Sequence, residues 1–263
     1  MTGKVKTSDL QFSIFNFQFS ICLLAAWLLS PWGVLHAASP PALFQAGVAA
    51  YQSGQYAAAA QAFKDSAGLH PAAGTLQNLG LSEWEYGQPG PAIVAWERAL
   101  WLDPFNSAAK GNLRFVRKTT LLDAPDLAWY EVVSTWLPAN WWGWIGAISF
   151  WVAIAAILLP TVFRIRKSAW HQAIAALGLT VFLLTLPACL GVHTRSRIGF
   201  IVEKNSPLRW TPTTEADFKL AQLSVGEPVR ILRSRGNFLL IKLHSTAETG
   251  WVLRSQLALI SDS

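Results

Sequence analysis

The sequence predicts a multidomain α plus β membrane protein with a short helical stack, a two-helix transmembrane hairpin and a small all-β barrel. Three observations predict this fold class. Residues 39–118 contain an internal repeat, residues 141–163 and 171–192 contain no Asp, Glu, Lys or Arg, and apolar residues alternate after 197. Charged residues make up 14% of the 263 residues, against about 25% in soluble domains. A purely soluble enzyme is therefore disfavoured.

The N-terminus has the pattern of a secretory signal peptide, predicted over residues 1–38. Two lysines precede an apolar stretch that is clearest from Phe19 to Leu29, and small residues follow at Ala37 and Ala38. Cleavage is expected near these alanines. The alternative is an uncleaved anchor, because the apolar stretch at 12–35 is long. In either case the segment that follows is expected to be exported.

The hairpin is predicted at residues 141–163 and 171–192, each long enough to cross a bilayer core of about 30 Å. The connecting loop, 164–170, carries three basic residues, Arg164, Arg166 and Lys167. Basic residues in short loops stay cytoplasmic. The segments before and after the hairpin are therefore expected outside, in agreement with the signal peptide. Indole rings favour the headgroup layer, and the outer end of the first span is rich in them: Trp136, Trp141, Trp142 and Trp144.

A repeat of 33 residues is the most specific signal before the membrane segment. Five residues recur at this spacing: Gly47, Gly54, Ala59, Phe63 and Pro71 return as Gly80, Gly87, Ala92, Trp96 and Pro104. Small residues let two helices approach, a turn glycine relieves backbone strain, an aromatic ring fills the gap and a proline ends the second helix. The pattern resembles the tetratricopeptide repeat (TPR), although Ser66 and Pro89 replace an expected Ala and Tyr.

The TPR resemblance implies repeats at about 40–72 and 73–105, followed by a capping helix at 106–118. Two repeats rarely suffice, because each buries its apolar face against a neighbour. In the capping helix, Leu113 and Val116 are expected to face inward.

The repeats also predict a surface that binds peptides or proteins. Gln45, Asn78 and Asn112 occupy the same position in successive first helices, which is the concave ladder in this family. Their amides can pair with the backbone of an extended peptide, and further apolar contacts are expected from Tyr51, Leu81 and Trp84. Trp84 is the best hot-spot candidate, since an exposed indole offers much area at low entropic cost. The alternative is that Trp84 packs on a neighbouring helix.

The linker at 119–140 contains a short, strongly apolar segment between Pro125 and Pro138. Two interpretations remain open. The segment is either an amphipathic helix lying flat in the outer membrane interface, or a helix that packs on the repeat domain.

Residues 198–261 predict short strands divided by turns. Strands are expected at 199–202, 228–233, 238–243 and 250–253, and a closing 3₁₀ turn and last strand at 255–259. The order of these segments is similar to that of the bacterial SH3-like domain, and the resemblance implies a small barrel. On its surface we expect Arg209, Trp210, Arg235 and Phe238 to bind partners, the arginines through anionic groups. Trp251 is expected in the core.

No pattern of catalytic or metal-binding residues is found in the sequence. The five histidines are scattered without a partner at metal-ligand spacing, and there is no Gly-rich phosphate loop or Gly-x-Ser-x-Gly elbow. The acids of the repeat, Glu83, Glu85 and Glu97, are expected on solvated helix faces. The net charge of +6 includes no basic run that would track phosphates. We predict a protein that is not an enzyme, uses no cofactor or metal and binds no nucleic acid.

The order of the parts resembles the BatE-type proteins of the bacterial aerotolerance (Bat) operon. The resemblance implies an inner-membrane protein with both modules outside the cytoplasm. It also implies partnership with von Willebrand factor A membrane proteins and a MoxR-family ATPase, and a role in envelope stress tolerance. Two hypotheses follow: an assembly scaffold for an envelope complex, or a cell-wall protein that links the membrane to peptidoglycan through the SH3-like domain.

Overall fold

The computed structural model describes residues 39–163, 168–213, 219–244 and 246–261. The signal sequence expected at 1–38 lies outside these ranges. The three basic residues of the expected cytoplasmic loop, Arg164, Arg166 and Lys167, lie outside them as well.

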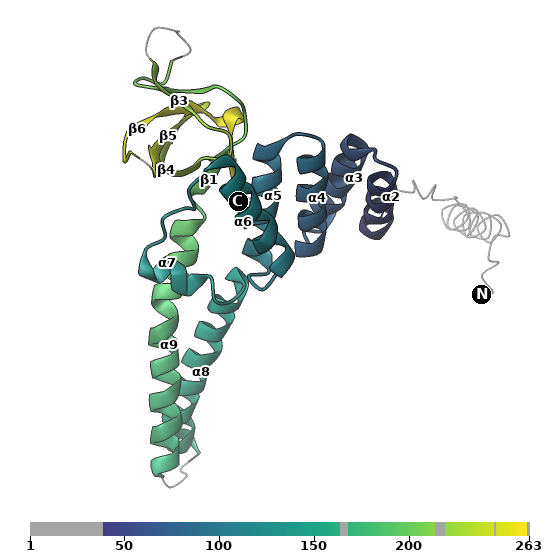
Figure 1. The fold of residues 1–263 in the computed structure, drawn as a ribbon. Coiled ribbons are helices and arrows are strands. Elements are labelled where there is room, and N and C mark those ends of the chain that lie inside the picture. The colour runs from purple at the N-terminus through teal and green to yellow at the C-terminus, as the bar shows by residue number, and fades with distance from the viewer. Residues whose placement is uncertain (1–38, 164–167, 214–218, 245, 262–263) are drawn as a thin grey trace, which may run out of the picture. The chain divides into compact units, whose positions relative to one another are not determined.

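The first part of the described chain consists of five helices that pack in chain order (Figure 1). They are α2 (Pro40–Gln52), α3 (Tyr56–Leu69), α4 (Ala73–Glu85), α5 (Pro89–Leu102) and α6 (Ser107–Thr120). Helices α2 and α3 form one antiparallel hairpin and α4 and α5 form the next, so the sequence repeat of 33 residues corresponds to one helical hairpin.

Close packing inside each hairpin explains why glycine and a large aromatic residue recur together. A Cβ atom on Gly47 would lie 2.8 Å from the ring of Phe63, and a Cβ atom on Gly80 would overlap the indole of Trp96. Both rings are almost completely buried. The missing side chain of each glycine therefore provides the space that the aromatic ring of the following helix fills.

The turns of the two hairpins require glycine because the backbone there has positive φ, +73° at Gly54 and +81° at Gly87. Pro89, which replaces the tyrosine expected from the repeat pattern, occupies the first turn of α5. A proline is tolerated there because the first N–H groups of a helix have no partner within the helix.

Helix α6 covers the end of the helical stack. The Asn106 side chain accepts a hydrogen bond of 2.9 Å from the backbone N–H of Ala109 and so caps the first turn. Leu113 and Val116 are buried, as expected, and belong to the core shared with α5. The helix ends at Leu121, which has left-handed backbone angles.

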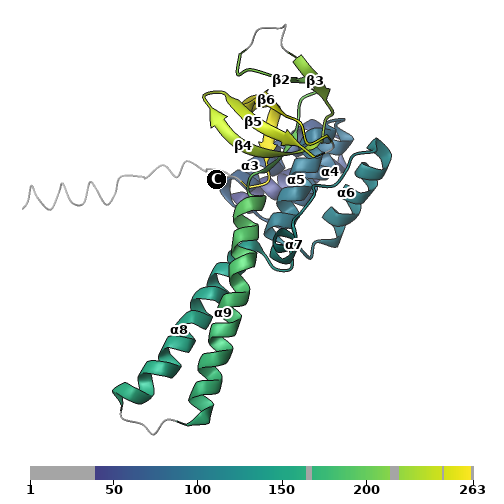
Figure 2. The same ribbon diagram turned by 90° about the vertical axis from the view of Figure 1, so that its left-hand side faces the viewer.

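Two long helices follow, α8 (Ala139–Val162) and α9 (Ala169–Arg195), and they pack against each other along their length (Figure 2). Both are long and apolar enough to cross a membrane, with mean hydropathies of 2.2 and 2.3 over an 18-residue window of each helix. Only 22% and 17% of those windows is buried, which differs from the core helix of a soluble domain. The helices approach closely at Gly178, where a Cβ atom would lie 2.9 Å from the carbonyl oxygen of Ser149.

The short helix α7 (Trp129–Ser134) lies within the linker and packs against α9. A Cβ atom on Gly191 of α9 would overlap the carbonyl of Tyr130, so the contact involves backbone atoms. The main packing partner of α7 is thus the second long helix, while Leu127 just before α7 packs on the core of the helical stack. The opposite side of this segment is open, since Trp129, Val132 and Trp136 are exposed.

The C-terminal part is one antiparallel sheet of seven strands in the order β3-β2-β6-β5-β4-β1-β7. The strands are β1 (Ile198–Ile201), β2 (Ser206–Arg209), β3 (Lys219–Leu223), β4 (Pro228–Arg235), β5 (Phe238–Leu243), β6 (Thr249–Leu253) and β7 (Leu257–Leu259), with a 3₁₀ turn at Arg254–Gln256. The expectation missed β2 and β3 as separate strands. Both are short, and β2 contains a proline.

The closed barrel expected for residues 198–261 is wrong, because the sheet is open and its edge strands, β3 and β7, do not pair with each other. The edge at β7 is instead covered by helix α5. Arg98 of this helix donates a hydrogen bond of 3.0 Å from Nε to the carbonyl oxygen of Leu259. A covered edge needs no further strand to satisfy its backbone.

One side of the sheet encloses its own core and the other side partly packs on the helices. Inward residues such as Leu208, Ile241 and Val252 form the sheet's core. All four residues of β1 are buried because this strand has neighbours on both sides: Ile201 faces the sheet's core, while Phe200 joins the core of α5 and α6.

Candidate functional site

The three amides predicted to line the helical stack lie on α2, α4 and α6, the first helix of each unit. Gln45 is exposed, and Asn78 and Asn112 are half-buried. Among the described residues, none of the three side chains forms a hydrogen bond within the chain. All three amides therefore keep their donors and acceptors for another molecule.

Trp84 is not a free indole. Its ring centroid lies 6.4 Å from that of Trp96 and 6.1 Å from that of Phe115, with an interplanar angle of 82° to the latter. Trp84 is half-buried and packs on the core. It thus fills the space between α4 and α6, whereas Phe115 keeps 59% of its surface exposed. Sequence comparison of the repeats missed Phe115, although it directly precedes the buried Val116.

The other two apolar candidates also have neighbours inside the stack. Tyr51 is half-buried and packs edge to face on Tyr56, with 5.4 Å between the centroids. Burial and the nearby Glu85 carboxylate raise the pKa of the Tyr51 hydroxyl. Leu81 packs against the core. Each of these side chains has a partly exposed face and contributes to a mixed polar and aromatic surface.

The predicted sheet residues Arg235, Phe238 and Arg209 share one face of the sheet. Arg235 and Phe238 are directly opposite each other on β4 and β5, and Arg209 is opposite Trp251 on β2 and β6. Their faces match because Cα partners in antiparallel strands place side chains on the same side. Trp210 directly follows Arg209 and is 64% exposed. The structure therefore brings the predicted arginines and Phe238 onto one surface.

Trp251, expected in the core, is half-buried on the outer face of the sheet. The neighbouring Gly250 and Val252 are buried on the inner side instead. Alternation along β6 explains the difference, because successive residues of a strand point to opposite faces. A Cβ atom on Gly250 would lie within 2.5 Å of Leu208, so no larger side chain fits inward there.

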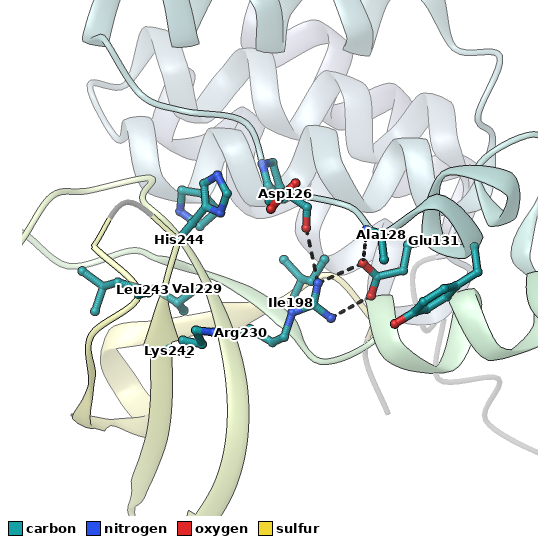
Figure 3. Close-up of a pocket in the computed structure, with 13 residues that line it drawn as sticks. Asp126, Ala128, Glu131, Ile198, Val229, Arg230, Lys242, Leu243 and His244 are labelled. Atoms are coloured by element: carbon teal, nitrogen blue, oxygen red, sulfur yellow. Dashed lines mark hydrogen bonds and ion pairs between the residues drawn. The ribbon is translucent and has the colours of Figure 1, made fainter.

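A cavity of about 530 Å³ that is lined by several charged groups lies beside α7 and the sheet (Figure 3). Its centre is an ion pair that sequence analysis did not find. Arg230 donates from Nη1 to Oε1 of Glu131 over 2.7 Å and from Nη2 to Oε2 over 2.9 Å. Arg230 also donates to the backbone carbonyl of Asp126 over 3.4 Å.

Glu131 is completely buried. Burial alone would raise the pKa of its carboxyl, but hydrogen bonds from Arg230 and from the backbone N–H of Ala128 outweigh that effect and hold the pKa below its ordinary value. The same carboxylate raises the pKa of the Arg230 guanidinium. The pair therefore stays charged near neutral pH. The sequence signal for it was an acid in the middle of the apolar segment between Pro125 and Pro138, since buried acids are almost always paired.

A second ion pair lies inside the helical stack, and Arg195 at the end of α9 contacts the stack near it. Glu97, expected on a solvated face, is nearly buried and forms an ion pair with Arg117 of α6. Burial raises the pKa of Glu97, against the lowering effect of Arg117 and Arg195. Arg195 lies 5.1 Å above the ring of Trp101 and donates to Ser134 Oγ over 3.1 Å.

Together these contacts join α5, α6, α7, α9 and β4 at one place. Among the described residues, no group of three or more His, Cys, Asp or Glu side chains could hold a metal ion. In this cavity Arg230 and Glu131 hold structural elements together, and the rest of the lining includes Lys242 and His244 (Figure 3).

Comparisons with protein-family models, with curated proteins and with solved structures found no match.

Proposed function

We propose that this chain is a non-enzymatic scaffold of a bacterial envelope complex, anchored in the inner membrane by α8 and α9. Its TPR-like helices and its SH3-like sheet lie outside the cytoplasm in this proposal and bind proteins. The partners proposed from the resemblance to BatE-type proteins are von Willebrand factor A membrane proteins, with a MoxR-family ATPase in the same stress or oxygen tolerance system.

The observation that carries the scaffold proposal is the apolar core that the helices and the sheet share. Ile198, Phe200 and Ile260 of the C-terminal part belong to the same buried cluster as Ile93 and Trp96 of α5. Two surfaces held by one core keep a constant separation. A partner that is bound to one surface meets the other at a high effective concentration, and no entropy is lost in orienting the two surfaces.

The TPR assignment is supported by the geometry of the hairpins. Each repeat has a small residue in the first helix under an aromatic ring of the second, Gly47 under Phe63 and Gly80 under Trp96. Gln45, Asn78 and Asn112 then recur on first helices. A row of unpaired amides is suited to the backbone of an extended peptide, because each amide offers both a donor and an acceptor.

Crosslinking in cells tests this proposal. A photoreactive residue at Gln45, which is exposed on α2, is expected to capture an integral-membrane protein of the von Willebrand factor A class. The matched control is the same residue at Lys64, which is exposed on the second helix α3. Capture from both positions alike, or from neither, would contradict a binding surface formed by the first helices.

Two variants, Trp84→Ala and Phe115→Ala, distinguish side chains that contact the partner from side chains that stabilise the helical stack. Phe115 is the more exposed ring, so Phe115→Ala is expected to reduce capture with little loss of stability, while Trp84→Ala also destabilises the stack by about 2–3 kcal/mol. Unchanged capture in both variants would exclude an aromatic contribution to binding.

The second candidate function is attachment to peptidoglycan through the sheet, and the exposed Trp210 favours it. An isolated fragment is unsuitable for the test, because Phe200 and Ile260 would lose the helices that bury them. The full chain in detergent should sediment with purified sacculi, and Trp210→Ala should release it. Failure of the full chain to sediment would rule out this function.

A further inference from the structure

The outer face of the sheet is partly covered by the rest of the chain and partly open. At β1 it packs on the helices through Phe200, and at β4 it meets Glu131 through Arg230. Beyond these contacts lies a surface that we name the open sheet face. It is formed by Arg209, Arg233, Arg235, Phe238, Leu240, Lys242, Trp251 and Leu253.

Strand register arranges this surface in rows that cross the strands. The longest row runs from Arg233 through Leu240 and Trp251 to Arg209 over β4, β5, β6 and β2. A second row contains Arg235, Phe238 and Leu253. In the longest row, arginines therefore stand at both ends and apolar side chains stand between them.

The charge of the sheet has one sign. The seven strands contain six basic residues and no Asp or Glu; the six are Arg209, Lys219, Arg230, Arg233, Arg235 and Lys242. Of these, Arg230 pairs with Glu131 in the described part of the chain. Arg233, Arg235 and Lys242 are exposed and have no ion pair among the described residues.

Arg209 has donors that the described part of the chain does not satisfy. Among the residues that the structure describes, its Nε and Nη1 atoms are buried and have no hydrogen-bond partner. A buried donor without a partner is unfavourable, and more so for a charged group. Glu131 already satisfies Arg230 on the same face of the sheet with a carboxylate, so an acidic side chain is the group that this surface accepts within its own chain.

We infer that the open sheet face binds an extended, acidic peptide segment of a partner protein. Three strand spacings separate Arg233 from Arg209, which amounts to about 14 Å. In an extended peptide, residues on one side are about 6.8 Å apart, so the carboxylates of residues i and i+4 span about the same distance. The side chain at i+2 then lies over Leu240 and Trp251. This inference rests on the proposed protein-binding role of the sheet.

A peptide fits this arrangement better than an anionic membrane surface does. Lipid headgroups offer charge without a required spacing, whereas the row places apolar side chains between two arginines at a distance that matches an extended chain. Leu240 and Trp251 are half-buried, so they gain from contact with one apolar side chain.

The test uses the full chain in nanodiscs of neutral lipid and a fluorescent peptide, Ser-Glu-Ser-Leu-Ser-Glu-Ser. Two control peptides carry Gln in place of Glu, or the same residues with adjacent glutamates. Fluorescence polarisation is expected to give saturable binding that is at least about tenfold weaker for either control. Arg209→Gln/Arg233→Gln should weaken binding of the acidic peptide by a similar factor.

Two further variants keep the test decisive. Arg233→Gln alone removes an exposed side chain, so it retains the fold even if the double variant does not; it should weaken binding by about threefold or more. Arg114→Gln/Lys118→Gln removes two exposed charges from α6 and should change binding by less than about twofold.

The inference is overturned by any of three results: no saturable binding, equal binding of the control peptides, or an equal loss in the α6 variant. Binding in neutral nanodiscs that disappears when phosphatidylglycerol is added would assign the arginines to lipid and would also overturn it. Crosslinking from Gln45 concerns a different surface. A negative result there together with binding here would reject the helical binding surface and retain this one.

Discussion

The sheet contacts its two neighbours in different ways. Against α5 and α6 it buries apolar side chains such as Phe200 and Ile260, while against α7 it forms the ion pair between Arg230 and Glu131. Apolar burial is non-directional and scales with area, whereas a bidentate ion pair has a required geometry. We therefore expect the first contact to supply stability and the second to set the orientation of the sheet relative to the hairpin of α8 and α9.

The largest effect is expected from the apolar contact. Phe200→Ala should destabilise the protein by about 3–5 kcal/mol, because the fully buried ring leaves a cavity between sheet and helices. Thermal unfolding of the full chain in detergent measures this. The matched control is Leu240→Ala on the open sheet face, which should cost less than half as much. Equal losses in both variants would show that the shared core is not the main stabilising contact.

Removing the arginine of the ion pair is expected to have the next largest effect. Arg230→Ala leaves the carboxylate of Glu131 buried without its partner, and the loss should be about 2–4 kcal/mol, since Arg230 itself is partly exposed. A double-mutant cycle with Glu131→Gln isolates the coupling. Additive losses in that cycle would mean that the two side chains do not stabilise each other.

The ion pair also predicts a pH dependence that the apolar contact lacks. The folded pKa of Glu131 lies below its ordinary value of 4.5, so its stabilisation is present above pH 4.5 and is lost as pH falls through the folded pKa. The difference in melting temperature between the wild type and Glu131→Gln should therefore shrink in acid, and the difference for Phe200→Ala should not. A wild-type advantage that grew in acid would contradict the direction of this pKa.

The smallest effects are expected from two glycines, one where α9 contacts α7 and one on an open face of α6. Gly191→Ala should destabilise by about 1–3 kcal/mol, because the new Cβ overlaps the carbonyl of Tyr130 and displaces α7 from α9. Gly111→Ala lies in α6 with open space around it and should stabilise by about 0.5–1 kcal/mol. A melting temperature that also rises for Gly191→Ala would mean that α7 moves away from the new Cβ atom without loss of stability.

Local sequence patterns predicted many of the helices and strands. The spacing of 33 residues predicted helical hairpins because glycine, aromatic ring and turn glycine interact within one hairpin, so their effect is visible in one stretch of chain. The uncharged segments predicted α8 and α9 for the same reason, since length and apolarity are local properties. Strands β4 to β6 followed from alternation, although their closure into a barrel did not.

The wrong and missing expectations concern partners that are distant in sequence. Trp84 packs on Phe115 from another unit, Glu97 pairs with Arg117, and Glu131 meets Arg230 across 99 residues. Which acid is buried, and which basic side chain pairs with it, depends on how elements that are distant in sequence pack together. No periodicity in one segment contains that information.

The sequence by itself therefore determined the kinds of elements in this protein, because helix, span and strand patterns arise from neighbours along the chain. Only the tertiary structure decided which surfaces are used and which remain open. It placed α5 against the edge of the sheet, paired Arg230 with Glu131 and, within the described part of the chain, left Nε and Nη1 of Arg209 without a hydrogen-bond partner. The physical reason is that burial and pairing of a charge are properties of the assembled fold, set by contacts between elements that the chain brings together only once it is folded.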